Sequence, residues 1–110
     1  MNHGLSDATV KKIQEVLAGF PEVEKAVLYG SRAKGTFKPG SDIDLTLYGP
    51  ALSFSLLGRI DTALDDLLLP YEMDLSLVSS ITHPALLDHI RRVGVVVYEK
   101  NALPVGALPG

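Results

Sequence analysis

Three acidic residues have the types and spacing of a metal-dependent catalytic site. Asp42 and Asp44 are one residue apart in a segment that alternates polar and apolar side chains. Residues i and i+2 of a β-strand face the same side, so these two carboxylates should project together. Asp74 lies in the next alternating segment and joins them if that strand is a neighbour with Asp74 on the same face. Close carboxylates raise one another's pKa values unless a cation neutralises them, and Mg²⁺ suits such oxygen ligands.

A Gly-Ser pair precedes the first of these acids, and ten residues separate Ser31 from Asp42. Gly30 and Ser31 directly follow a short apolar segment that is expected to be a buried strand. Glycine allows close approach of the backbone to phosphate, and a short helix beginning at Ser31 would aim free N–H groups at a triphosphate. Taken singly, an Asp-X-Asp pair is more typical of a solvated strand face and Gly-Ser of an ordinary turn. The combination of both, with a further acid on a later strand, favours a catalytic site.

A cationic stretch adjoins the Gly-Ser pair. It contains Arg32, Lys34 and Lys38. Arg32 and Lys34 are candidates for contact with phosphate, and the alternative is a solvated loop. Lys38 is expected in solvent. The histidines have no metal-binding spacing, and His83 and His89 are expected to have structural roles.

The elements that must position these residues follow from hydrophobic periodicity. The pattern predicts one α/β (α+β) domain over residues 1–100, built as an α/β sandwich of helices and strands, with residues 101–110 as a tail. Three main strands and three long helices are expected, and the order of the strands is left open. The predicted helices are 7–19, with Ser6 as its N-cap, 57–68, and a third that starts near Pro84 and has Gly94 as its C′ residue. The predicted strands are 25–29, 42–48, 71–78 and a last short one at 95–98. Tyr29 and Tyr48 flank apolar strands and are expected to be core or core-edge residues.

Composition excludes several classes of protein. The chain has 110 residues, no cysteine and a formal net charge of −3, so disulfide frameworks and thiolate zinc sites are excluded and direct binding to duplex DNA is not expected. No apolar run is long enough to cross a membrane. The first residues lack the pattern of a signal peptide, so a cytoplasmic protein is expected.

The segment from Gly30 to Gly35, together with Ser41 to Leu45, resembles the signature of the DNA polymerase beta nucleotidyltransferase superfamily. The short chain is similar to its minimal nucleotidyltransferase (MNT) members over about residues 7–100. The resemblance implies a polymerase-beta-like fold, which is a small mixed sheet flanked by helices. It also implies an enzyme that uses two Mg²⁺ ions to transfer a nucleoside monophosphate from a nucleoside triphosphate. It further implies that Asp42, Asp44 and Asp74 are the metal ligands, and that Gly30 and Ser31 form the triphosphate-binding turn.

The resemblance also implies a partner. MNT proteins are commonly encoded beside HEPN-domain proteins, often as antitoxins, and some transfer AMP from ATP to a tyrosine of a HEPN ribonuclease toxin. A chain this short leaves little room for an acceptor-recognition domain, so a protein partner is expected. Two alternatives remain open: a non-catalytic module that neutralises its partner by contact, and an enzyme that modifies a small molecule such as an antibiotic.

Overall fold

The computed structural model describes residues 3–38 and 40–100. The predicted tail, residues 101–110, lies outside the described residues. Within the described part of the chain, no helix has both the length and the apolar character needed to cross a membrane.

Nine elements follow one another within the described residues, and helices alternate with strands except where η1 precedes α4. The order agrees with the sequence prediction, and the predicted short helix after the first strand is present. The elements are α1 (Asp7–Ala18), β1 (Lys25–Tyr29), α2 (Ser31–Lys34), β2 (Ile43–Tyr48), α3 (Phe54–Asp65), β3 (Met73–Leu77), the 3₁₀ turn η1 (Val78–Ser80), α4 (Pro84–Val93) and β4 (Val95–Glu99).

The four strands form one mixed sheet in the order β3-β2-β1-β4. The first strand is central and pairs antiparallel with both β2 and β4. The second strand pairs parallel with β3, and the connection between them passes through α3. A parallel pair requires such a crossover, because a tight turn can join only antiparallel neighbours. The last short strand predicted at 95–98 is confirmed as β4, an edge strand as long as β1.

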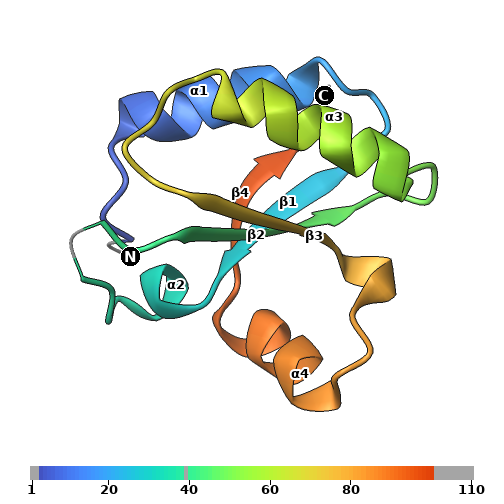
Figure 1. Ribbon diagram of the computed structural model, residues 1–110. Helices are drawn as coiled ribbons and strands as arrows, with labels where there is room; N and C mark the ends of the chain where they lie inside the picture. The colour runs from blue at the N-terminus through green and yellow to red at the C-terminus, as the bar shows by residue number, and fades with distance from the viewer. Residues whose placement is uncertain (1–2, 39, 101–110) are drawn as a thin grey trace, which may run out of the picture.

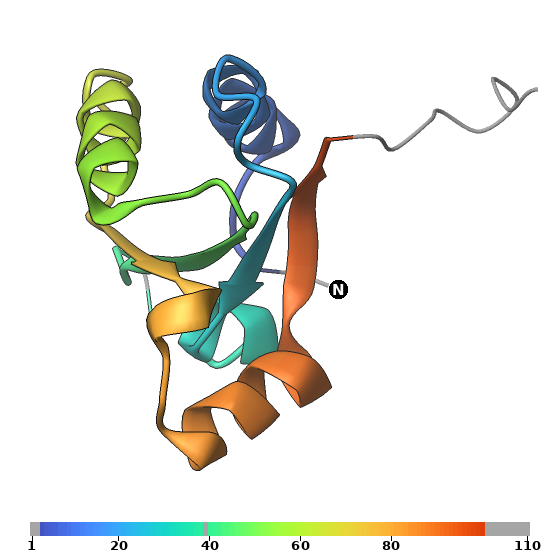
Figure 2. The ribbon, with the colours of Figure 1, turned by 90° about the vertical axis from the view of Figure 1, so that its right-hand side faces the viewer.

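Helices α1 and α3 lie side by side over one face of the sheet, whereas α4 lies on the opposite side (Figures 1 and 2). The main core fills the space between the sheet and the helices α1 and α3. It is built from alternate residues of the strands, which meet the buried stripe of each helix. Its fully buried members include Leu28, Leu45, Leu47, Leu17, Ile60 and Leu64.

Local signals explain most ends of the elements. Ser6 is the N-cap of α1, as predicted, and its hydroxyl accepts a hydrogen bond from the Thr9 N–H. Gly94 does end α4, but its backbone is extended (φ −60°, ψ 141°), so the predicted C′ role is wrong. The chain passes directly into β4 at this glycine, which leaves no room for a left-handed cap.

Two predicted boundaries were also wrong. Helix α3 spans Phe54–Asp65, earlier than the predicted 57–68, because the Ser53 hydroxyl caps it by accepting from the Leu56 N–H. Leu68 lies beyond its end with positive φ and is 88% exposed. Strand β2 begins at Ile43, so Asp42 lies just before the strand that was predicted to contain it.

Candidate active site

Asp44 and Asp74 lie next to each other on the face of the sheet opposite α1 and α3. The register aligns Asp44 with Tyr29 on β1 and with Asp74 on β3. The adjacent row of paired residues consists of Leu28, Leu45 and Leu75, which face the main core. Because successive residues of a strand face opposite sides of the sheet, the row of Asp44 faces away from that core. The sequence alone left the order of strands open, and the parallel β2–β3 pairing brings these two acids together.

Asp42 belongs to the same electrostatic group although it precedes β2. The pKa of Asp44 is raised above its ordinary value by burial first, and then by the negative charges of Asp74 and Asp42. Asp42 and Asp74 are exposed, whereas Asp44 is half-buried. The charges of Asp42 and Asp74 therefore both act on Asp44, which is the least solvated of the three carboxylates, and the joint metal-binding role predicted for them stays a prediction.

Tyr29 belongs to this polar face, although the sequence indicated a core or core-edge residue. Burial raises the pKa of the Tyr29 hydroxyl, as do the charges of Asp74 and Asp44, while a hydrogen bond with the Ser76 side chain lowers it. Ser76 also donates a hydrogen bond to the buried Thr46 hydroxyl (Oγ–Oγ1 3.0 Å). A row of hydroxyl groups thus lies next to the row of carboxylates.

The donor chemistry of this face fits Mg²⁺. Carboxylate oxygens are the ligands that this hard cation takes, and their excess negative charge favours a cation between them. Within residues 3–38 and 40–100, no three acidic or histidine side chains stand close enough to form a ready-made metal cage. Asp44 and Asp74 share one face of the sheet, but their carboxylates and that of Asp42 are not gathered around one point.

The Gly-Ser turn packs directly against Asp44. Gly30 adopts φ +78°, ψ −155°, a conformation that is nearly exclusive to glycine, and it is the N-cap of α2. A Cβ at this position would overlap the Asp44 carboxylate oxygen Oδ2. Ser31 begins the one-turn helix, whose first N–H groups have no partner among the helix's own carbonyls. The turn and the central carboxylate are therefore neighbours.

His89 of α4 makes a contact that the sequence did not indicate. Its Nε2 atom accepts a hydrogen bond from the Gly30 N–H at 3.0 Å, across 59 positions of sequence. The Tyr29 ring stands edge-on to the imidazole, with the ring centroids 6.4 Å apart. No local pattern of the sequence could predict this contact, because it depends on how α4 packs against β1.

Arg32 is placed differently from Lys34. Its side chain is only 2% exposed, with Nε donating to the Ser41 carbonyl (3.0 Å) and Nη1 donating to the His3 carbonyl (2.9 Å). The guanidinium also lies over the rings of Phe37 and Tyr71, 4.9 and 4.6 Å from their centroids. These contacts tie three segments together around the Gly-Ser turn. Lys34 is exposed, and the predicted phosphate contacts of both residues stay predictions.

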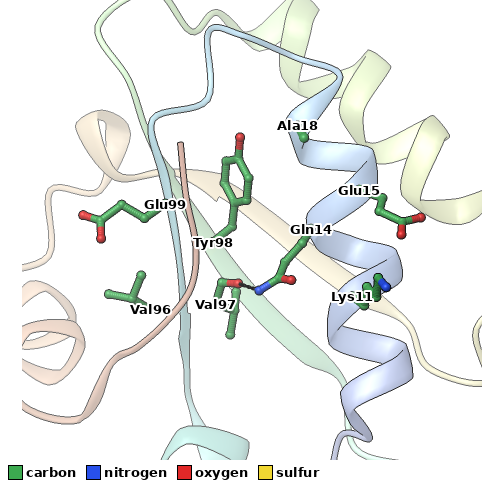
Figure 3. Close-up of a pocket in the computed structure, with 8 residues that line it drawn as sticks. All are labelled: Lys11, Gln14, Glu15, Ala18, Val96, Val97, Tyr98 and Glu99. Carbon is green, nitrogen blue, oxygen red and sulfur yellow. Dashed lines mark hydrogen bonds between the residues drawn. The ribbon is translucent and has the colours of Figure 1, made fainter. Parts of the chain in front are cut away.

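Among the hollows in the surface, two differ in how close they lie to the acidic row. A groove of about 520 Å³ runs between α1 and the edge strand β4, and Figure 3 shows Gln14 crossing it to donate to the Val97 carbonyl (2.8 Å). The strand β1 separates this groove from β2 and its carboxylates. A smaller one of about 320 Å³ lies beside Asp74 between α3 and β3, with the exposed Phe54 at its border. Only the second adjoins the acidic row.

A mixed four-stranded sheet with helices on both faces is the architecture of the polymerase-beta-like nucleotidyltransferases. The chain belongs to this family: residues 11–103 match the family described as "Polymerase beta, Nucleotidyltransferase". No curated protein sequence matches the chain. The resemblance given by the sequence motif is confirmed at the level of the family and the fold.

Solved structures with the same fold come from toxin–antitoxin complexes. One, a toxin–antitoxin with AMP-PNP, superposes with a TM-score of 0.68 at 22% identity, covering 84% of this chain and 74% of the other. Another, from Shewanella oneidensis, is a tri-AMPylated HEPN toxin in complex with an MNT antitoxin (TM-score 0.65, 18% identity, 86% and 73% covered). A MntA–HepT toxin–antitoxin complex gives a TM-score of 0.65 at 19% identity, with 86% and 73% covered.

Proposed function

We propose that this protein is a Mg²⁺-dependent adenylyltransferase that transfers AMP from ATP to a tyrosine hydroxyl of a HEPN toxin in the cytoplasm, and thereby acts as its antitoxin. The observation that carries the proposal is the row of carboxylates on β2 and β3 directly beside the Gly30–Ser31 turn. Membership of the nucleotidyltransferase family supports transfer of a nucleotide. The similar structures include a toxin–antitoxin with AMP-PNP and an AMPylated HEPN toxin bound to an MNT antitoxin, and these complexes support the proposed donor and partner.

Each residue has a role that its position allows. Asp42 and Asp44 would hold two Mg²⁺ ions, and Asp74 would hold the ion nearer the acceptor. When bound, such ions neutralise the triphosphate and lower the pKa of the attacking hydroxyl. Ser31 and the first amides of α2 would bind the terminal phosphates.

The transfer itself is a displacement at phosphorus. The tyrosine oxygen of the partner forms a bond to the α-phosphorus of ATP, the bond from that phosphorus to the bridging oxygen breaks, and pyrophosphate leaves. Asp74 is exposed on the edge strand β3, and its carboxylate would help to take the hydroxyl proton. Most of the rate enhancement comes from positioning and charge stabilisation, so the loss of one carboxylate should be severe.

The test uses the protein with its HEPN partner, ATP and Mg²⁺, and measures the intact mass of the partner. The wild type should add the mass of AMP and release pyrophosphate, whereas Asp44→Asn should not. Asp65→Asn is the matched control, because Asp65 is an exposed acid at the far end of α3. Neutralisation of the partner without any change of its mass would refute the proposal in favour of the non-catalytic binding module.

A further inference from the structure

Helix α4 contributes one polar side chain to the Gly-Ser turn. The half-buried His89 accepts the Gly30 N–H through Nε2 at 3.0 Å, and its ring meets the edge of the neighbouring Tyr29 ring at an interplanar angle of 81°. Both residues that meet the imidazole therefore belong to the junction of β1 and α2. This junction is the point at which the proposed triphosphate site begins.

The contact with His89 gives an acceptor to the Gly30 N–H, which neither β1 nor α2 uses in its own hydrogen bonds. Gly30 follows the last residue of β1, and α2 closes its first turn through the Gly30 carbonyl, which accepts from the Lys34 N–H (3.2 Å). The amide of Gly30 itself points to His89 instead. A half-buried amide without a partner costs free energy, so an acceptor at this position favours the turn geometry that the structure has. Ser31 follows directly, and its placement depends on that geometry.

The hydrogen bond assigns the protonation state of the imidazole. Nε2 can accept only when it carries no proton, so the ring is neutral with its hydrogen on Nδ1. The edge-on Tyr29 ring restricts how the imidazole can rotate. The acceptor is therefore held toward the turn by packing as well as by the hydrogen bond.

We propose that His89 is a positioning residue for the nucleotide: through its Nε2 acceptor, α4 holds the Gly30–Ser31 turn in the conformation that receives the phosphates of the nucleoside triphosphate. This inference rests on the proposed function. His89 acts through the turn and does not itself touch the reacting atoms. The helix that follows the last catalytic strand is thereby coupled to the phosphate end of the site.

The substitutions follow from the acceptor role. His89→Ala removes the acceptor, and a neutral hydrogen bond is worth about a three- to tenfold change in affinity. We expect this variant to bind the Mg²⁺ complex of α,β-methylene ATP about three- to tenfold more weakly, and to raise KM for ATP more than it lowers kcat. His89→Gln places an amide oxygen near the position of Nε2 and should restore binding to within about twofold of wild type. His83→Ala is the matched control, because His83 is the exposed N-cap of the same helix and its side chain makes no capping hydrogen bond.

The readouts separate this inference from the proposed function. Calorimetric titration with the uncleavable analogue needs neither the partner nor the transfer step, so binding without transfer would refute only the transfer. Nitrogen-15 NMR of the wild-type imidazole needs no variant and should show the Nδ1–H tautomer. A proton on Nε2, equal weakening by His89→Gln and His89→Ala, or wild-type binding in His89→Ala would each overturn the positioning role. A wild-type protein that binds no nucleotide would overturn both proposals.

Discussion

Substitution of Gly30 by alanine tests the close approach of the phosphate-binding turn to the central carboxylate. Two separate penalties are expected. The first is conformational: φ +78° with ψ −155° costs a non-glycine residue about 1–3 kcal/mol. The second is steric: the new Cβ would overlap Oδ2 of Asp44 and lie 3.4 Å from its Cγ. Overpacking of this kind costs about 1–3 kcal/mol when the neighbour cannot move freely, and Asp44 is held inside β2.

Gly40 provides a matched control for the conformational penalty. It has φ +80°, and a Cβ added there meets nothing within 4 Å. Gly40→Ala therefore carries only the strain of positive φ, about 1–2 kcal/mol. We expect Gly30→Ala to lower the free energy of unfolding by about 2–6 kcal/mol, of which the steric part, about 1–3 kcal/mol, is absent in Gly40→Ala.

Urea denaturation of the three proteins measures these differences, with unchanged m-values as the check that unfolding stays two-state. Titration with Mg²⁺ and α,β-methylene ATP is the second assay, because the displaced Asp44 should weaken binding only in the Gly30 variant. Equal losses of stability in the two alanine variants, with equal nucleotide affinities, would refute the argument. Gly30 would then be required for its backbone conformation alone.

Two other substitutions test the charges around the turn. The raised pKa of Asp44 means that ionisation of its carboxyl group lowers the stability of the folded protein. This penalty is absent at acidic pH, grows as the pH rises above the ordinary pKa of 3.8 through the folded pKa, and then stays constant. Asp44→Asn should therefore raise the unfolding free energy at pH 7.5 by up to about 1 kcal/mol and leave it unchanged near pH 4. This magnitude is the repulsion between two charges roughly 5 Å apart in high dielectric. A lower unfolding free energy of the variant in urea melts at pH 7.5 would contradict the expectation. Arg32→Lys should cost about 2–4 kcal/mol, because an ammonium cannot donate to both carbonyls while stacking between Phe37 and Tyr71. Unchanged stability together with weaker nucleotide binding would instead support the phosphate contact predicted for Arg32.

Local patterns were sufficient for the order of the elements and for the family. Alternation at residues 42–48 predicted a strand with one polar face. In β2, Asp44 is half-buried between the buried Ile43 and Leu45 as expected, whereas Thr46 on the same face is buried. The hydroxyl of Ser6 predicted the start of α1. These features depend on residues within a few positions of one another, and the motif from Gly30 to Asp44 also lies within one short segment. A sequence carries such information directly.

Other features depended on long-range contacts. The parallel pairing of β2 with β3 decided that Asp74 stands beside Asp44, because the crossover through α3 could have returned the strand to either edge.

The environments of Arg32 and His89 were likewise decided by the tertiary structure. Arg32 appeared from its position to be a phosphate ligand, yet its guanidinium is buried against the carbonyls of His3 and Ser41. His89 gave no signal in the sequence, and only the packing of α4 on β1 brings it to Gly30. The sequence by itself determined which residues could do chemistry and which local elements hold them. The tertiary structure decided which of them meet, because hydrogen bonds and burial between distant segments have no local periodicity from which they could be predicted.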